Sequence, residues 1–142
     1  MSHELLQEKL DSVGRCLARV KEKTPQTVEG LKDDIDIQDI ITLNLERLVQ
    51  LCVDISLIVL SEKNTAVPAT MAEGFALLAD VGVISDTIAE RMAKAAGFRN
   101  IAVHAYRKID WDIVWKIITE HLEDFHVFSA SIIKSIGKNV QK

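Results

Sequence analysis

The stretch Leu-Val-Gln-Leu-Cys-Val-Asp-Ile-Ser-Leu-Ile-Val-Leu, residues 48–60, is the most apolar run in the chain. It carries the carboxylate of Asp54 and falls short of the roughly 20 apolar residues that a membrane helix needs. Before it, Ile37 and Ile41 begin the same stripe of apolar residues at helical spacing. The pattern therefore predicts a buried central helix over about residues 33–61.

A first helix is predicted over residues 2 to about 23, where apolar residues recur at alternating steps of four and three. Thr24-Pro25 should end it, because a residue that precedes proline is pushed out of the α region. A linker containing Gly30 is expected to follow. The apolar stripe of this first helix consists of Leu6, Leu10, Val13, Leu17 and Val20.

Two helices are expected after the central one. Thr70 and Glu73 have the spacing of a capping box at the start of a short helix, and Gly82 marks its end. Ser85 is the expected N-cap of the next helix. Its regular part is expected to break near Gly97.

The last helix is predicted from a long apolar stripe that contains several large side chains. Asp110, at the end of a polar turn, is its expected N-cap, and residues 138–142 are expected to fray. The stripe consists of Trp111, Trp115, Ile118, Leu122, Phe125, Phe128, Ile132 and Ile136.

These segments predict an all-α fold, an up-and-down bundle of four long helices and one short helix. The 142 residues, 48% of them apolar, suffice for one core, so we expect a single domain over residues 1–142. Two prolines and six glycines are few for a β-sandwich, which needs many turn residues.

The cysteines and the N-terminus point to a cytoplasmic protein. Cys16 and Cys52 lie in apolar helical patterns without a disulfide framework or a metal knuckle, so they are expected to be reduced core residues. The N-terminal residues are charged from the start and include no apolar segment typical of a secretory signal. We expect neither a membrane association nor a bound metal or cofactor.

The charge balance bears on nucleic-acid binding. A formal net charge of −4 gives no overall attraction to phosphate backbones, so such binding would require a local basic patch. The residues that could form one are Arg91, Lys94, Arg99, Arg107 and Lys108.

The residues suited to phosphate chemistry cluster in Gly-Phe-Arg-Asn-Ile-Ala-Val-His-Ala-Tyr, residues 97–106. On an ideal helix Asn100 and His104 lie about 40° apart, but Arg99 and His104 differ by about 140°. A cleft that uses both Arg99 and His104 therefore needs a distorted helix end or a second protomer. We accordingly expect two copies to pair symmetrically.

The chemistry of this cluster suits RNA cleavage. A neutral imidazole at His104 can accept the 2′-OH proton, and the freed oxygen attacks the adjacent phosphorus. Arg99 can stabilise the charge that builds on the phosphoryl oxygens, and Asn100 can orient His104 or the phosphate. DNA lacks the 2′-OH and should be inert. Spacing alone also fits an ordinary helix end, with Tyr106 as an interfacial ring whose hydroxyl lies in water.

Phe98 to Tyr106, followed by Ile109-Asp110-Trp111, resembles the RxxxxHxY motif of HepT toxins, a family of the HEPN class, and its flanking sequence. The resemblance covers roughly residues 35–120 and includes Pro68 and the segment Ala72-Glu73-Gly74-Phe75. Where relatives commonly have Arg or Leu after the Asn, this chain has Ile101-Ala102, a departure that concerns local RNA contacts and leaves the motif positions filled.

The resemblance implies a HEPN bundle that dimerises around a composite cleft and acts as the endoribonuclease toxin of a toxin–antitoxin pair. It implies that Arg99 and His104 are the catalytic residues and need no metal. The implied partner is a minimal nucleotidyltransferase antitoxin that transfers AMP to Tyr106. The phosphates added beside Arg99 would then block the RNA phosphate site.

Other interpretations remain open at this point. The same fold could serve as a non-catalytic subunit that binds a nucleotide or a partner, or as a purely structural dimer. Asn44 and Asp54 interrupt apolar helix faces, and buried polar groups need partners. Asp54 either pairs with a neighbouring helix or approaches the cleft, where it could orient Arg99 or raise the pKa of His104.

Overall fold

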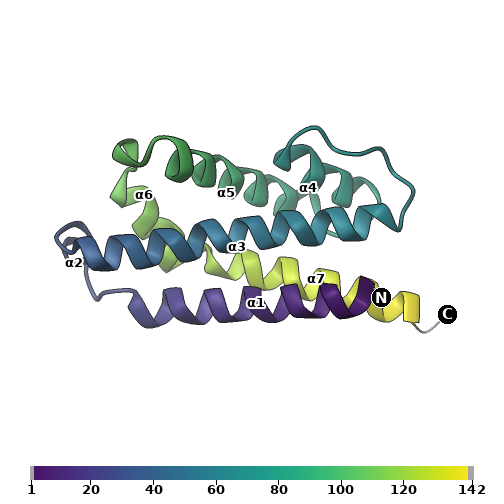
Figure 1. The fold of residues 1–142 in the computed structure, drawn as a ribbon, viewed down its shortest axis with the longest axis horizontal. Coiled ribbons are helices and arrows are strands. Elements are labelled where there is room, and N and C mark those ends of the chain that lie inside the picture. The colour runs from purple at the N-terminus through teal and green to yellow at the C-terminus, as the bar shows by residue number, and fades with distance from the viewer. Residues whose placement is uncertain (1, 141–142) are drawn as a thin grey trace.

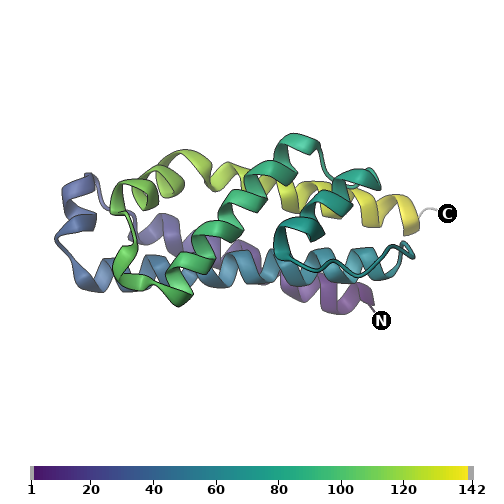
Figure 2. The ribbon, with the colours of Figure 1, turned by 90° about the horizontal axis from the view of Figure 1, so that it is seen from above.

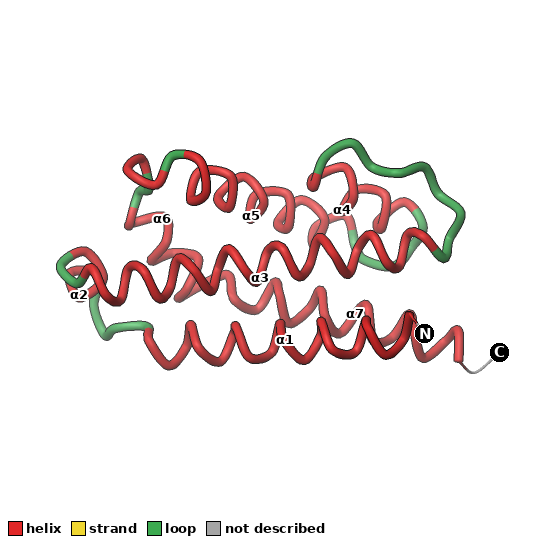
Figure 3. The backbone as a smooth tube through the Cα atoms, viewed as in Figure 1, coloured by secondary structure: helices red, strands yellow, loops and turns green. Residues whose placement is uncertain are grey.

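The computed structural model describes the backbone of residues 2–140 and the side chains of residues 3–137. Within residues 2–140 the chain forms helices and no strands, as predicted (Figures 1 and 3). The helices are α1 (Ser2–Lys23), α2 (Val28–Lys32), α3 (Ile35–Ser61), α4 (Met71–Asp80), α5 (Asp86–His104), α6 (Trp111–Lys116) and α7 (Leu122–Val140). A 3-10 turn, Tyr106–Lys108, precedes α6, and a π-helical turn, Ile117–His121, joins α6 to α7.

The four long helices α1, α3, α5 and α7 run alternately up and down, which confirms the predicted bundle (Figures 1 and 2). α3 packs against α1, α4 and α5, so the most apolar segment of the sequence occupies the middle of the fold. The short helix α4 lies against α5 near the end of the bundle that also holds the start of α1 and the end of α7.

The core is built from the predicted apolar stripes. All five stripe residues of α1 are buried, and so are Ile41, Leu48, Ile55 and Val59 of α3. Phe75 of α4 meets Phe128 of α7 edge to face, with ring centroids 5.8 Å apart. Cys16 and Cys52 are buried and free, as expected.

Three predicted helix starts are confirmed by their caps. The Thr70 side chain accepts a hydrogen bond from the Glu73 backbone N–H, and Ser85 caps α5 through the Ile88 N–H. Asp110 caps α6 in the same way. α7 extends to Val140, so residues 138–140, which were expected to fray, are helical, whereas residues 141–142 lie outside the part of the chain that the structure describes.

Three local features differ from the sequence-based prediction. The expected break near Gly97 is wrong, because α5 continues as regular helix to His104. The segment after Pro25 is not only linker: Thr27 caps the single-turn helix α2 by accepting the Gly30 N–H. The π-helical turn Ile117–His121 interrupts the predicted last helix. The helix continues through Gly97 because one exposed glycine costs a helix only about 1 kcal/mol, which contacts of the flanking residues readily offset.

No helix within residues 2–140 is long and apolar enough to cross a membrane.

Candidate active site

Arg99 lies on the flank of α5 that faces α3. Its Nη2 donates a hydrogen bond to Oε1 of Gln50, over 3.0 Å. Its Nε is buried and has no hydrogen-bond partner among the described residues. A buried donor without a partner costs about 1–3 kcal/mol, and a catalytic role is one explanation for such a group. Arg99 is thus anchored at one nitrogen and unsatisfied at another.

A chain of polar contacts holds Gln50 in place. Its Nε2 donates to Oδ1 of Asp54 over 2.9 Å, and Oδ2 of Asp54 pairs with Nζ of Lys9 on α1 over 3.3 Å. Because the amide nitrogen is engaged by Asp54, the amide oxygen faces Arg99. Asp54 therefore pairs with a neighbouring helix and also reaches Arg99 through Gln50, which joins the two interpretations that the sequence left open.

Asn44 has a local structural role in this chain. It is buried, and its Nδ2 donates to the carbonyl oxygen of Ile40 over 2.8 Å. This hydrogen bond supplies the partner that a buried polar group needs.

Asn100 and His104 are exposed on α5, and His104 is its last residue. Since α5 stays regular to His104, the first of the two alternatives, a distorted helix end, does not hold. The helical geometry keeps Asn100 and His104 on one face, while Arg99 is directed toward α3. A single protomer thus presents the arginine and the histidine on different flanks.

Tyr106 follows the end of α5, and its side chain contacts α3. Its hydroxyl donates to Oδ1 of Asp39 over 2.8 Å, and its ring meets Trp111 edge to face, with centroids 6.1 Å apart. Burial, the hydrogen bond to Asp39 and the Asp39 charge raise the pKa of Tyr106 to about 12. The phenol is neutral at physiological pH, and its hydroxyl is held by Asp39 at an exposed position.

One residue of the predicted basic patch has its charge paired. Arg91 is paired with Asp124, over 2.8 Å, whereas Lys94, Arg107 and Lys108 are exposed. Within the described part of the chain, no group of three or more His, Cys, Asp or Glu side chains is arranged to hold a metal ion.

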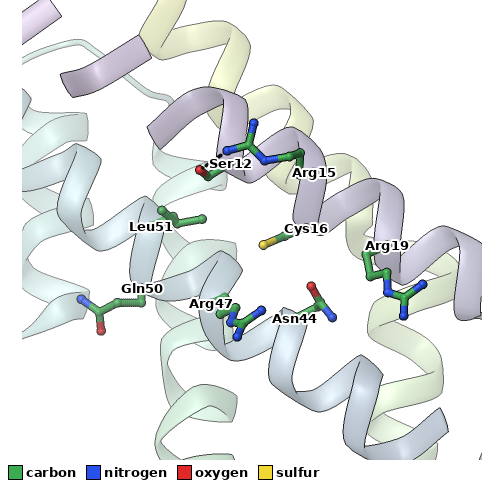
Figure 4. Close-up of a pocket in the computed structure, with 8 residues that line it drawn as sticks. All are labelled: Ser12, Arg15, Cys16, Arg19, Asn44, Arg47, Gln50 and Leu51. Atoms are coloured by element: carbon green, nitrogen blue, oxygen red, sulfur yellow. Dashed lines mark hydrogen bonds between the residues drawn. The ribbon is translucent and has the colours of Figure 1, made fainter. Parts of the chain in front are cut away.

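A cavity of about 630 Å³ lies between α1 and α3 (Figure 4). We call it the arginine groove. The sequence pattern did not reveal it, although Arg15 and Arg19 are one helical turn apart and therefore share a face of α1. Its lining residues are Ser12, Arg15, Cys16, Arg19, Asn44, Arg47, Gln50 and Leu51.

Comparisons with known proteins agree with this architecture. A family model described as Ribonuclease HepT-like matches residues 13–132. The mRNA nuclease HepT of Shewanella oneidensis is 31% identical over 94% of this chain and 98% of its own length. The tRNA nuclease HepT of Aphanizomenon flos-aquae is 24% identical over 90% of this chain and 87% of its own length.

A solved structure extends the likeness to three dimensions. It is a tri-AMPylated Shewanella oneidensis HEPN toxin in complex with an MNT antitoxin. This chain superposes on that structure with a TM-score of 0.85 and 32% identity, over 92% of this chain and 96% of the other. By sequence and by fold, the chain belongs to the HepT-like ribonuclease family.

Proposed function

We propose that this protein is the RNA-cleaving toxin of a two-protein toxin–antitoxin system, with Arg99 and His104 as its catalytic pair. The observation that carries the proposal is the state of Arg99, which is oriented by Gln50 yet keeps a buried Nε without a partner among the described residues. Such a guanidinium, five residues before an exposed histidine in a ribonuclease family, is suited to a phosphate group.

The proposed reaction is an internal transfer at phosphorus. The neutral imidazole of His104 takes the proton of a ribose 2′-OH, and the 2′-oxygen forms a bond to the adjacent phosphorus. The bond from phosphorus to the 5′-oxygen of the next nucleotide breaks, and that oxygen takes up a proton. The products are a 2′,3′-cyclic phosphate and a 5′-hydroxyl. Arg99 stabilises the charge on the phosphoryl oxygens, Asn100 supports the phosphate or His104, and the step requires no metal.

The proposed cleft is shared between two copies of the chain. Arg99 and His104 lie on different flanks of a regular helix, so a partner protomer that supplies one of them completes the pair. Exposed apolar side chains on the same helices support a contact between protomers. They are Leu43 and Leu57 on α3, and Ile101 and Val103 on α5.

The proposed partner is a nucleotidyltransferase antitoxin that acts in the cytoplasm. The related Shewanella toxin is described as tri-AMPylated and in complex with an MNT antitoxin. Here the acceptor would be Tyr106, the only tyrosine in the chain. Its oxygen attacks the α-phosphorus of ATP, pyrophosphate leaves, and the phenol proton is released. The added phosphate repels RNA phosphates near Arg99. Incubation with the antitoxin and ATP should add AMP masses to the wild type and none to Tyr106→Phe.

The experiment that tests the catalytic proposal incubates purified protein with RNA, or with DNA of the same sequence, in the presence of EDTA. The wild type should cleave only RNA and leave 2′,3′-cyclic ends, because DNA lacks the nucleophile. His104→Ala and Arg99→Ala should each lose most of this activity, about 10²-fold or more. Cleavage by both variants at the wild-type rate, or by none of the three proteins, would reject the catalytic proposal.

A further inference from the structure

The arginine groove concentrates positive charge in an acidic protein. Arg15 and Arg19 extend from α1 and Arg47 from α3, around a floor that includes the thiol of Cys16 (Figure 4). Burial raises the pKa of the Cys16 thiol, and the charges of Arg47 and Arg15 oppose that rise. Three guanidiniums therefore share one hollow in a chain whose formal net charge is −4.

These charges are weakly compensated. Arg15 bonds to the hydroxyl of Ser12 over 2.7 Å, which neutralises nothing. Arg19 pairs with Glu22 in an exposed contact of 3.2 Å, and exposed pairs of this kind contribute little. Arg47 forms no ion pair or side-chain hydrogen bond within the described residues. Neighbouring cations repel one another unless an anion lies between them, so the groove favours an anionic ligand.

The groove is joined to Arg99 through one residue. Gln50 lines the groove, and its amide points away from α1, where Oε1 accepts the hydrogen bond from Arg99 (Figure 4). Arg15 and Arg19 are about 6 Å apart along the axis of α1, because each residue of a helix rises 1.5 Å. The two arginines of α1 are therefore neighbours on one face of that helix.

We propose that the arginine groove binds the phosphates of an RNA strand beside the bond to be cleaved, an inference that rests on the proposed RNA-cleaving function. The forked donors of arginine match phosphate oxygens, and a volume of about 630 Å³ is much larger than one phosphate needs. No aromatic side chain lines the groove, so bases have no ring to stack on there. The groove therefore adds affinity for the backbone but no sequence preference.

The test measures binding without chemistry. The probe is a fluorescein-labelled, single-stranded 2′-O-methyl RNA of mixed sequence, which cannot be cleaved because its 2′-oxygens are blocked. Fluorescence anisotropy gives its Kd at several salt concentrations for the full-length wild type and for the double variant Arg15→Gln/Arg47→Gln. The matched control is Lys116→Gln/Lys134→Gln, which removes the same charge from exposed lysines outside the groove.

The groove variant should bind about tenfold more weakly at low salt. The slope of log Kd against log salt should fall by about 1.4, since each phosphate contact to a single strand contributes about 0.7. The control should keep the wild-type slope. Equal slopes and affinities for the groove variant and the wild type would overturn the proposal. A change in oligomeric state by light scattering, caused by the groove variant alone, would overturn it too, because the groove would then be a contact between copies.

Failure of this proposal and failure of the proposed function give different results. If the wild type cleaves RNA and the Arg15→Gln/Arg47→Gln variant binds the probe with the wild-type Kd, only the proposal for the groove is rejected. Absence of cleavage by the wild type, together with binding that depends on these arginines, rejects the proposed RNA-cleaving function and leaves the groove as a binding site for RNA phosphates.

Discussion

The Tyr106 hydroxyl donates a hydrogen bond to Asp39 on α3, and the effect of this contact can be measured in the pH titration of the tyrosine. We expect the tyrosinate absorbance of the folded protein to rise around a pKa of about 12. Asp39→Asn should move this pKa part of the way toward the ordinary value of about 10, because the carboxylate charge is lost but burial, the largest cause, remains. The chain has one tyrosine, so the curve belongs to Tyr106. Superimposable curves for the two proteins would contradict the assigned contact.

The same shift predicts a change of stability with pH. The folded-state pKa of Tyr106 lies above its unfolded value, so folding favours the protonated phenol. The stabilisation should be complete below about pH 10 and should be lost as the pH rises through about 12. Urea unfolding across this range should show a smaller decline for Tyr106→Phe than for the wild type.

Gln50 is predicted to position Arg99. Gln50→Leu removes the oxygen that accepts from Arg99 Nη2, so the guanidinium should lose its orientation. We expect kcat for RNA cleavage to fall about 10-fold to 10²-fold with a smaller change in KM, since misplacement of a catalytic group acts mainly on the transition state. Gln7→Leu, on the exposed side of α1, is the control and should keep both constants. An unchanged kcat for Gln50→Leu would exclude the positioning role.

The residues of the site differ in how far the sequence could reveal them. Arg99, Asn100, His104 and Tyr106 lie within eight residues and form a recognisable motif. Gln50 and Asp39 were not identified, because they meet Arg99 and Tyr106 from positions 49 and 67 residues away. The packing of α5 and of the 3-10 turn that follows it on α3 brings these partners together.

At the level of helices, Gly97 and Gly82 offer a matched pair of substitutions. Gly97 lies in the regular part of α5, and an added Cβ would meet no atom within 4 Å. Gly97→Ala should raise the free energy of unfolding by about 0.5–1 kcal/mol, because alanine restricts the unfolded chain and favours helix. Gly82 has a φ of +81°, so Gly82→Ala should lower it by about 1 kcal/mol.

Chemical denaturation of the two glycine variants checks whether the free energy of unfolding rises in Gly97→Ala and falls in Gly82→Ala. A loss of stability in Gly97→Ala would indicate that α5 is distorted near residue 97, as the sequence alone had suggested. RNA cleavage should be unchanged in Gly82→Ala, since the turn after α4 lies outside the proposed site.

The periodic parts of the helices were predictable, and the interruptions were not. The stripes of α1, α3 and α7 have many apolar residues in register, and Thr70, Ser85 and Asp110 are strong N-caps. α2 is only one turn long, and the π-helical turn Ile117–His121 spans five residues. Such short features leave little periodic signal in the sequence.

At the level of the whole molecule, a shared cleft predicts complementation between two inactive variants. In a mixed dimer of Arg99→Ala and His104→Ala chains, one cleft combines the intact arginine of one protomer with the intact histidine of the other. After subunit exchange, the mixture should recover about a quarter of the wild-type RNA cleavage, because half of the dimers are mixed and each has one complete cleft. Light scattering should give the mass of a dimer.

The complementation experiment needs proof of exchange. Differently tagged variants should co-purify as mixed dimers before the activity is measured. Mixed dimers that stay inactive would mean that each protomer holds its own complete pair, and the composite cleft would be wrong.

Because the Tyr106 hydroxyl donates a hydrogen bond to Asp39, a covalent modification of that hydroxyl would also affect the backbone conformation. A phenol oxygen that carries a phosphodiester has no proton left to donate, and its new negative charge would face the carboxylate of Asp39. The two groups would repel at a distance where they now attract. A modification of Tyr106 would therefore detach the turn at residues 106–108 from α3, and the silenced protein would differ from the active one in backbone conformation as well as in charge.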